Sequence, residues 1–236
     1  MFIKICGLFR DEDIDIVNEV RPDYIGFVFA KSKRRVSPVM AQYLRFRLAN
    51  GIIPAGVFVN ARIAEITELY SNGIISIAQL HGEEDESYIA ALKKATGNKP
   101  IPVIKTLTIN PSIINTANQH ESTRTNTKKT SKGSNSLLLN IPGNADYILL
   151  DSGAGSGKTF NWDNLNTLKY PGSNTGKFPK PWFLAGGINI KNIDQAMALN
   201  PFAIDVSSGA ETDGIKDRKK ILELVATVRG RTNEQF

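Results

Sequence analysis

Short apolar segments recur along the whole chain, and each is followed by a stretch in which apolar residues return every three or four positions. The first pattern is typical of buried strands and the second of amphipathic helices. The predicted strands are Phe2–Cys6, Tyr24–Phe29, Ala55–Val59, Ile75–Leu80, Pro102–Thr106, Tyr147–Asp151, Trp182–Ala185 and Ala203–Ser207. The predicted helices cover residues 11–20, 38–49, 61–72, 84–96, 112–119, 162–169, 190–199 and 216–229.

Eight strands that alternate with eight helices match the count of a (β/α)8 barrel. We therefore predict an α/β protein, a TIM barrel that forms a single domain over residues 1–236. The length agrees with this prediction, because such barrels commonly fold as one domain of about this size. A doubly wound sheet is the alternative, but it usually has fewer strands.

One segment is too polar for a minimal barrel. Residues 110–145 contain 17 Ser, Thr or Asn among 36 positions and show little apolar periodicity. Such a composition cannot bury a helix face, so we expect a long polar insertion at the surface before the sixth strand. Residues 170–181 are rich in Pro and Gly and are predicted to form a loop.

Composition narrows the possible chemistry. The chain has one cysteine, Cys6, and two histidines, His81 and His120. A single cysteine excludes an internal disulfide and a multi-cysteine metal site, and two histidines argue against a histidine-based one. We therefore expect no metal. No signal peptide is evident at the N-terminus, so a reducing cytoplasm is the expected compartment.

The net charge of +6 raises the possibility of a nucleic-acid partner. The basic residues are scattered, however, apart from a run at residues 31–35 and a lysine-bearing stretch at 128–132. A modest positive excess of this kind suits a small anionic metabolite. No apolar run approaches the roughly 20 residues of a membrane helix, so neither nucleic acid nor membrane is an expected partner.

Candidate catalytic residues lie at the ends of the predicted strands. In a barrel, the C-terminal ends of the strands converge on one mouth, which carries the active site. Cys6 ends the first strand, His81 follows the fourth and Asp151 ends the sixth. Side chains alternate along a strand, so Lys4 and Cys6 share one face, and Ile3 and Ile5 the other. Because the isoleucines should pack on helices, we expect Lys4 and Cys6 to point into the barrel.

Small residues follow the last two predicted strands. Gly186 and Gly187 follow the seventh, and Ser207, Ser208 and Gly209 end the eighth. Barrels often bind a phosphate group at this place with backbone N–H groups, and glycine allows the close approach. The sequence therefore predicts a phosphorylated substrate. Residues 152–159 resemble a nucleotide-binding P-loop, but the spacing of the first glycine fails by one position.

Nine short motifs occur in order along the chain and together resemble the phosphoribosylanthranilate isomerase family of tryptophan biosynthesis. They are Lys4–Gly7, Gly26–Phe29, Ser32–Val36, Gly56–Asn60, Gln79–Gly82, Leu149–Asp151, Gly155–Trp162, Leu184–Gly187 and Asp205–Gly209. The chain departs from the family pattern in its polar insertion and at Asn161, Ala210 and Thr212. None of these departures touches the acid or base that the resemblance implies.

The resemblance implies an Amadori rearrangement of N-(5-phosphoribosyl)anthranilate by general acid–base catalysis, with no cofactor. It assigns the base to Cys6 and the acid to Asp151. Arg34 would hold the anthranilate carboxylate, with His81 and Asp205 as further substrate contacts. The phosphate would lie on Gly186, Gly187, Ser207, Ser208 and Gly209. The partner is thus a small phosphorylated aminosugar, and the enzyme is expected to be a monomer or a homodimer.

Two other functions compete with this one. The first is a neighbouring phosphate-binding barrel enzyme, such as indole-glycerol-phosphate synthase or a ribonucleotide isomerase of histidine biosynthesis. The second is a barrel without catalytic activity that binds a phosphorylated ligand or nucleic acid. The combination of Cys6 and Asp151 favours the isomerase, and substrate turnover separates it from a binding protein.

Overall fold

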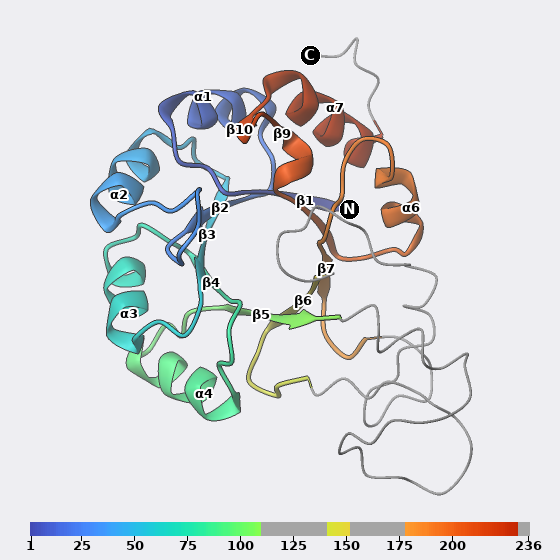
Figure 1. Ribbon diagram of the computed structural model, residues 1–236. Coiled ribbons are helices and arrows are strands. Elements are labelled where there is room, and N and C mark those ends of the chain that lie inside the picture. The colour runs from blue at the N-terminus through green and yellow to red at the C-terminus, as the bar shows by residue number, and fades with distance from the viewer. Residues whose placement is uncertain (110–140, 152–177, 231–236) are drawn as a thin grey trace, which may run out of the picture.

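The computed structural model describes residues 1–109, 141–151 and 178–230, and in these residues eight parallel strands close into a barrel (Figure 1). Each strand pairs with the next along the chain, and the last pairs with the first. The strands are β1 Phe2–Cys6, β2 Tyr24–Val28, β3 Ile53–Phe58, β4 Ile77–Leu80, β5 Val103–Thr108, β6 Tyr147–Asp151, β7 Trp182–Leu184 and β8 Ala203–Val206. The predicted (β/α)8 barrel is confirmed.

Helices surround the barrel on its outer side (Figure 1). They are α1 Asp11–Val20, α2 Pro38–Arg47, α3 Ile63–Ser71, α4 Glu86–Ala95, α6 Ile193–Ala198 and α7 Arg218–Arg229. The helices predicted at 112–119 and 162–169 lie outside the described residues, as does the P-loop-like segment at 152–159. Of the predicted insertion, only residues 141–145 are described, and Ala145 within them is buried.

Local chemistry explains where several helices begin. The Ser37 side chain accepts a hydrogen bond from the Met40 N–H, and Pro38 occupies the first helical position. Asp85 caps α4 in the same manner, through the Tyr88 N–H. Asp217 caps α7 through the Lys220 N–H. Each cap satisfies an N–H group that has no partner within the helix.

The core has two parts, as alternation along the strands requires. Ile3, Ile5 and Ile25 belong to a large apolar cluster that packs the strands against the helices. A smaller cluster fills the inside of the barrel with Tyr24, Ala55, Ile77, Ile104, Leu149, Phe183, Ala185 and Ala203. Several of the next inward positions toward the mouth are polar, namely Gln79, Thr106, Asp151 and Asp205.

The last predicted helix begins two residues later than expected. Residues 211–216 instead form a hairpin, in which β9 Glu211–Thr212 pairs with β10 Ile215–Lys216. Asp213 and Gly214 form its turn with φ values of 53° and 80°. Such positive values are required by the tight two-residue turns that join antiparallel strands. The hairpin follows η3 Ser208–Ala210 directly and so belongs to the mouth of the barrel.

Candidate active site

Cys6 ends β1 at the barrel mouth, where it is 8% exposed. The chain after it is held firmly, because the N–H groups of Gly7 and Leu8 both donate to the Gly26 carbonyl, at 2.8 and 3.1 Å. Gly26 also makes room for the thiol, since a Cβ at this position would lie 2.6 Å from the Cys6 sulfur. β2 therefore fixes the backbone that follows the thiol and leaves the space that the thiol occupies.

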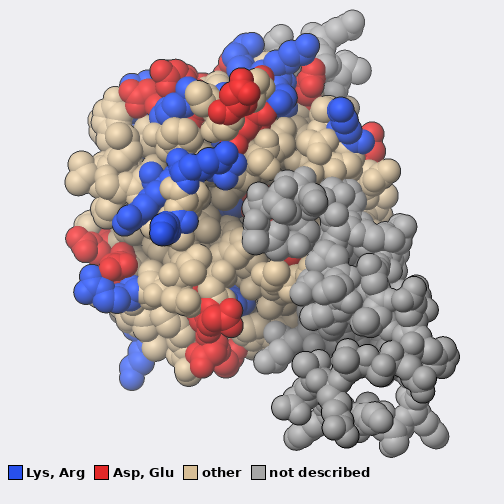
Figure 2. Space-filling model, viewed as in Figure 1, with Lys and Arg blue, Asp and Glu red and all other residues tan. Residues whose placement is uncertain are grey.

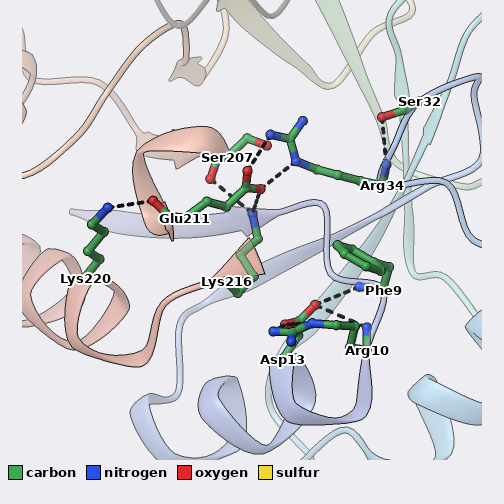
Figure 3. Close-up of polar contacts among 9 residues, drawn as sticks. All are labelled: Phe9, Arg10, Asp13, Ser32, Arg34, Ser207, Glu211, Lys216 and Lys220. Atoms are coloured by element: carbon green, nitrogen blue, oxygen red, sulfur yellow. Dashed lines mark hydrogen bonds and ion pairs between the residues drawn. The ribbon is translucent and has the colours of Figure 1, made fainter. Parts of the chain in front are cut away.

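A capping network steadies the loop that follows Cys6. Asp13 accepts hydrogen bonds from the N–H groups of Phe9 and Arg10 at 3.0 and 3.2 Å, as Figure 3 shows. The Arg10 side chain returns to the same carboxylate through Nη2, at 2.6 Å. Asp13 is fully buried, so these contacts compensate the burial of its charge.

Lys4 lies inside the barrel, as the alternation along β1 predicts, and it is fully buried. Its Nζ donates to both carboxylate oxygens of Asp205, at 3.0 and 2.9 Å. The two residues face each other because Lys4 on β1 is in register with Asp205 on β8. Burial acts to lower the pKa of Lys4, but Asp205 and Cys6 outweigh it, so the pKa lies above its ordinary value.

The Cys6 side chain loses its proton less readily than an exposed cysteine does. Burial raises its pKa above the ordinary 9.0, and the nearby Asp205 carboxylate adds to this. Lys4 and Lys216 act in the opposite direction without reversing the shift. Lys4 therefore supplies a positive field at the thiol, but this field only moderates the cost of forming the thiolate.

Asp151 ends β6 and faces His81, which follows β4. The Nε2 atom of His81 lies 3.4 Å from Oδ2 of Asp151. The side chains are 30% and 14% exposed, so both can meet a ligand at the mouth. The His81 N–H donates to the Phe58 carbonyl at 2.8 Å, which fixes the start of its loop.

Two buried residues that the sequence analysis did not single out support the His81 loop. The Nζ of Lys105 on β5 lies 2.5 Å from the Gly82 carbonyl oxygen and 2.9 Å from Oε2 of Glu84. Glu84 in turn accepts hydrogen bonds from the N–H groups of Asn60 and Gly82, at 2.6 and 2.8 Å. These contacts oppose the burial of the Glu84 carboxylate and lower its pKa.

The loops after β7 and β8 meet at the expected phosphate site. Gly186 and Gly187 have φ values of 92° and 67°, and the Gly187 carbonyl accepts from the side chains of Asn189 and Asn192. A Cβ on Gly209 would lie 1.9 Å from the Ile188 carbonyl oxygen, so the two loops touch at this point. Ser207 and Ser208 lead into η3 beside them. The arrangement gathers all five predicted phosphate residues at the adjoining ends of two neighbouring strands.

Arg34 reaches the mouth from the loop after β2 and meets a carboxylate that the sequence analysis missed. Its guanidinium donates to both oxygens of Glu211, which also pairs with Lys216 (Figure 3). Lys and Arg side chains gather near the middle of the face seen along the barrel (Figure 2). Lys31, Lys33 and Arg35 in the same loop are exposed, as expected for surface charges.

Two buried polar atoms complete the lining of the barrel interior. Within the described residues, Oε1 of Gln79 and Oγ1 of Thr106 have no hydrogen-bond partner. No group of three or more His, Cys, Asp or Glu residues is placed to hold a metal in this part of the chain. Nor do the described ranges contain a helix long and apolar enough to cross a membrane.

Comparison with known proteins agrees with this geometry. A family model described as "N-(5'phosphoribosyl)anthranilate (PRA) isomerase" matches residues 3–227. The N-(5'-phosphoribosyl)anthranilate isomerase of Endomicrobium trichonymphae is 39% identical over 96% of this chain and 98% of its own length. The corresponding protein of Clostridium acetobutylicum is 40% identical over 96% of this chain and 97% of its own.

Solved structures give the same result. The crystal structure of phosphoribosyl anthranilate isomerase from Thermus thermophilus matches with a TM-score of 0.71 and 28% identity, over 98% of this chain and 99% of that one. Another isomerase structure, in complex with reduced 1-(o-carboxyphenylamino)-1-deoxyribulose 5-phosphate, matches with a TM-score of 0.66 and 28% identity over the same shares. The chain therefore belongs to the N-(5'-phosphoribosyl)anthranilate isomerase family.

Proposed function

We propose that this chain is a phosphoribosylanthranilate isomerase of tryptophan biosynthesis. It converts N-(5'-phosphoribosyl)anthranilate into 1-(2-carboxyphenylamino)-1-deoxyribulose 5-phosphate by an Amadori rearrangement. The family match over residues 3–227 supports the reaction. The observation that carries the site assignment is the position of Cys6 and Asp151, which both end barrel strands at the same mouth.

The substrate has a phosphate at one end and a carboxylate at the other, and the mouth offers a site for each. Gly186, Gly187, Ser207, Ser208 and Gly209 form the phosphate site, where backbone N–H groups suit an anion. Arg34, across β1 from that site, takes the carboxylate with its planar guanidinium. Between the two sites, the sugar lies over β1 and β6.

Asp151 supplies the first proton. Opening of the ribose ring requires a proton on the ring oxygen, and the ring then opens to a protonated Schiff base between C1 and the anthranilate nitrogen. A carboxyl group acts in this way only when its surroundings favour the protonated form. The Nε2 atom of His81 lies 3.4 Å from Oδ2 of this carboxyl group.

Cys6 acts next, as the base. Its thiolate removes the proton from C2 of the Schiff base, and the electrons of that bond move to neutralise the positively charged nitrogen. The enolamine formed in this step tautomerises to the aminoketone product. Asp205, fixed by Lys4 beside the thiol, is placed to hold a sugar hydroxyl or the substrate amine. The reaction needs no net oxidant or reductant.

The direct test is turnover of freshly prepared phosphoribosylanthranilate, followed through the loss of anthranilate fluorescence with a chelator present. Loss at a rate proportional to protein concentration supports the proposal. The matched control is Cys6→Ser, purified in the same way, because it changes a single atom at the proposed base. A folded wild-type protein with no rate above the spontaneous background contradicts the proposed function.

The oligomeric state and the compartment stay predictions. One solved relative, from Thermotoga maritima, is described as a dimeric enzyme from which monomers were generated. For this chain we propose either a monomer or a homodimer in the cytoplasm. Sedimentation equilibrium of the purified protein distinguishes the two states.

A further inference from the structure

Arg34 forms a bidentate ion pair with Glu211 of the same chain. Its Nε lies 2.5 Å from Oε1 of Glu211, and its Nη2 lies 2.6 Å from Oε2 (Figure 3). The side chains of Arg34 and Glu211 are 16% and 4% exposed. Paired hydrogen bonds of this kind fix the plane of the guanidinium as well as its position. The arginine proposed to bind a substrate carboxylate is thus already held by a carboxylate of the protein.

Glu211 is itself fixed on its other side. The Nζ of Lys216 donates to Oε1 of Glu211 at 2.7 Å and to the Ser207 carbonyl at 3.1 Å. Lys220 donates to the backbone carbonyl of Glu211 at 2.6 Å. The hairpin explains the first contact, since Lys216 is directly opposite Glu211 in its register. Lys216 thereby connects the carboxylate that holds Arg34 to a residue of the phosphate site.

The pairing leaves one edge of the guanidinium available. A guanidinium has five N–H donors, and Glu211 uses one on Nε and one on Nη2. Within the described residues, both donors of Nη1 and the second donor of Nη2 have no further partner, and they form a fork on the adjoining edge. The stem of Arg34 lies against the loop after Cys6, because a Cβ on Gly7 would come within 2.5 Å of its Cδ. The stem of Arg34 is therefore held beside the residue that follows the proposed base.

The charges of Arg34, Glu211 and Lys216 together make the available edge of the guanidinium attractive to an anion. Glu211 contributes one negative charge, and Arg34 and Lys216 contribute two positive ones. The hydrogen bond to Glu211 raises the pKa of Arg34, so the guanidinium stays charged. Burial raises the pKa of Glu211, but the hydrogen bonds from Arg34 and Lys216 outweigh this and lower it, so the acid stays ionised. The cluster thus carries a net positive charge toward the mouth.

We propose that Glu211 is a positioning residue, which sets Arg34 so that its remaining edge receives the carboxylate of the substrate. This inference rests on the proposed function, in which Arg34 binds that group. An arginine without such a partner has to lose much of its rotamer freedom when the substrate binds, whereas here the ordering is complete beforehand. Glu211 therefore contributes to affinity for the carboxylate end without touching the reacting atoms.

The test uses Glu211→Gln, which keeps the shape of the side chain and removes its charge. Two inhibitors are compared: the reduced product analogue, which carries the carboxylate, and the same compound with an unsubstituted phenyl ring. We expect the variant to weaken the first by about tenfold and the second by less than about twofold, since only a carboxylate uses the positioned edge. The KM for substrate should rise by a larger factor than kcat falls. Glu12→Gln, an exposed residue of α1, is the control for the change in charge.

A double-mutant cycle with Arg34→Met separates the possible failures. The arginine variant alone should lose the preference for the carboxylate-bearing inhibitor, and if it does not, the assignment of Arg34 is wrong. In the Arg34→Met background, Glu211→Gln should cause no further loss of inhibitor affinity. Equal weakening of both inhibitors, or additive effects in the cycle, overturns the positioning role. If Glu211→Gln does not fold, Glu211→Asp keeps the charge, shortens the reach and should give the same pattern.

Discussion

The buried pair of Lys4 and Asp205 provides a test that separates folding from catalysis. Lys4 is fully buried and Asp205 is 7% exposed, so removal of either charge leaves the other in a poorly solvated place. Breaking such a pair from one side costs about 3–5 kcal/mol. A domain is stable by only about 5–15 kcal/mol, so this is a large fraction of the total. We expect Lys4→Met to lower the free energy of unfolding by this amount.

The double variant Lys4→Met/Asp205→Asn should be more stable than the sum of the single effects predicts. It removes both charges and keeps the volume of the pair nearly unchanged, so no unpaired ion remains. We expect a coupling energy of about 1–3 kcal/mol between the two positions, measured by urea denaturation of all four proteins. Asp205→Asn alone should fold, because its amide oxygen still accepts a hydrogen bond from Lys4.

Activity should respond differently from stability. Lys4 is the strongest of the influences that lower the pKa of Cys6, and its removal makes the thiolate rarer still. Each added unit of pKa costs about a factor of ten in thiolate at neutral pH. The value of kcat/KM should therefore fall in Lys4→Met and should stay below that of the wild type in the double variant. Additive stability effects, or full activity without Lys4, would refute this reasoning.

The remaining predictions concern the acid, the base and the phosphate loop. Cys6→Ser and Asp151→Asn should each lower kcat by about a hundredfold to ten-thousandfold while the circular dichroism spectrum is kept, and full activity in either variant contradicts its role. Because the pKa of Cys6 lies above 9.0, the rate of its alkylation by iodoacetamide should rise about tenfold per pH unit from pH 6.5 to 8.5, and a flat profile contradicts the raised pKa. Gly209→Ala places a Cβ 1.9 Å from the Ile188 carbonyl oxygen, so it should force the two loops apart, cost about 1–3 kcal/mol of stability and raise KM. An unchanged melting temperature and KM for that variant would show that the two loops accommodate the added methyl group without moving apart.

Much of the barrel is predictable because its strands are short apolar segments separated by helical patterns. Alternation along β1 also places Lys4 and Cys6 inside the barrel, and both are buried there. What alternation does not provide is the partner of Lys4. Asp205 lies 201 residues away along the chain, and the two meet only because β8 closes the barrel on β1. Closure is a property of the whole sheet, so no local pattern determines this register.

The hairpin at residues 211–216 was missed for a different reason, since the sequence does carry its signal. Asp213-Gly214 between two short segments is a typical sequence for a tight turn. The apolar pattern predicts the last helix from residue 216, two residues before α7 begins, and so assigns Lys216 to the helix and not to the second strand of the hairpin. A correct assignment of the turn places Glu211 and Lys216 opposite each other, where opposite charges attract. Arg34 as the third member still required the fold, because it comes from the loop after β2.

An acid next to an arginine that binds an anion weakens the attraction for that anion, so its presence needs a physical reason. Without Glu211, a charged Lys216 would be repelled by Arg34. With Glu211 between them, both cations are held in fixed places and a net positive charge remains. Burial lowers the pKa of Lys216 although Glu211 opposes this, so loss of the acid should favour the neutral amine. Glu211 therefore weakens the long-range attraction for the substrate anion, but it fixes the binding edge of Arg34 before the substrate binds.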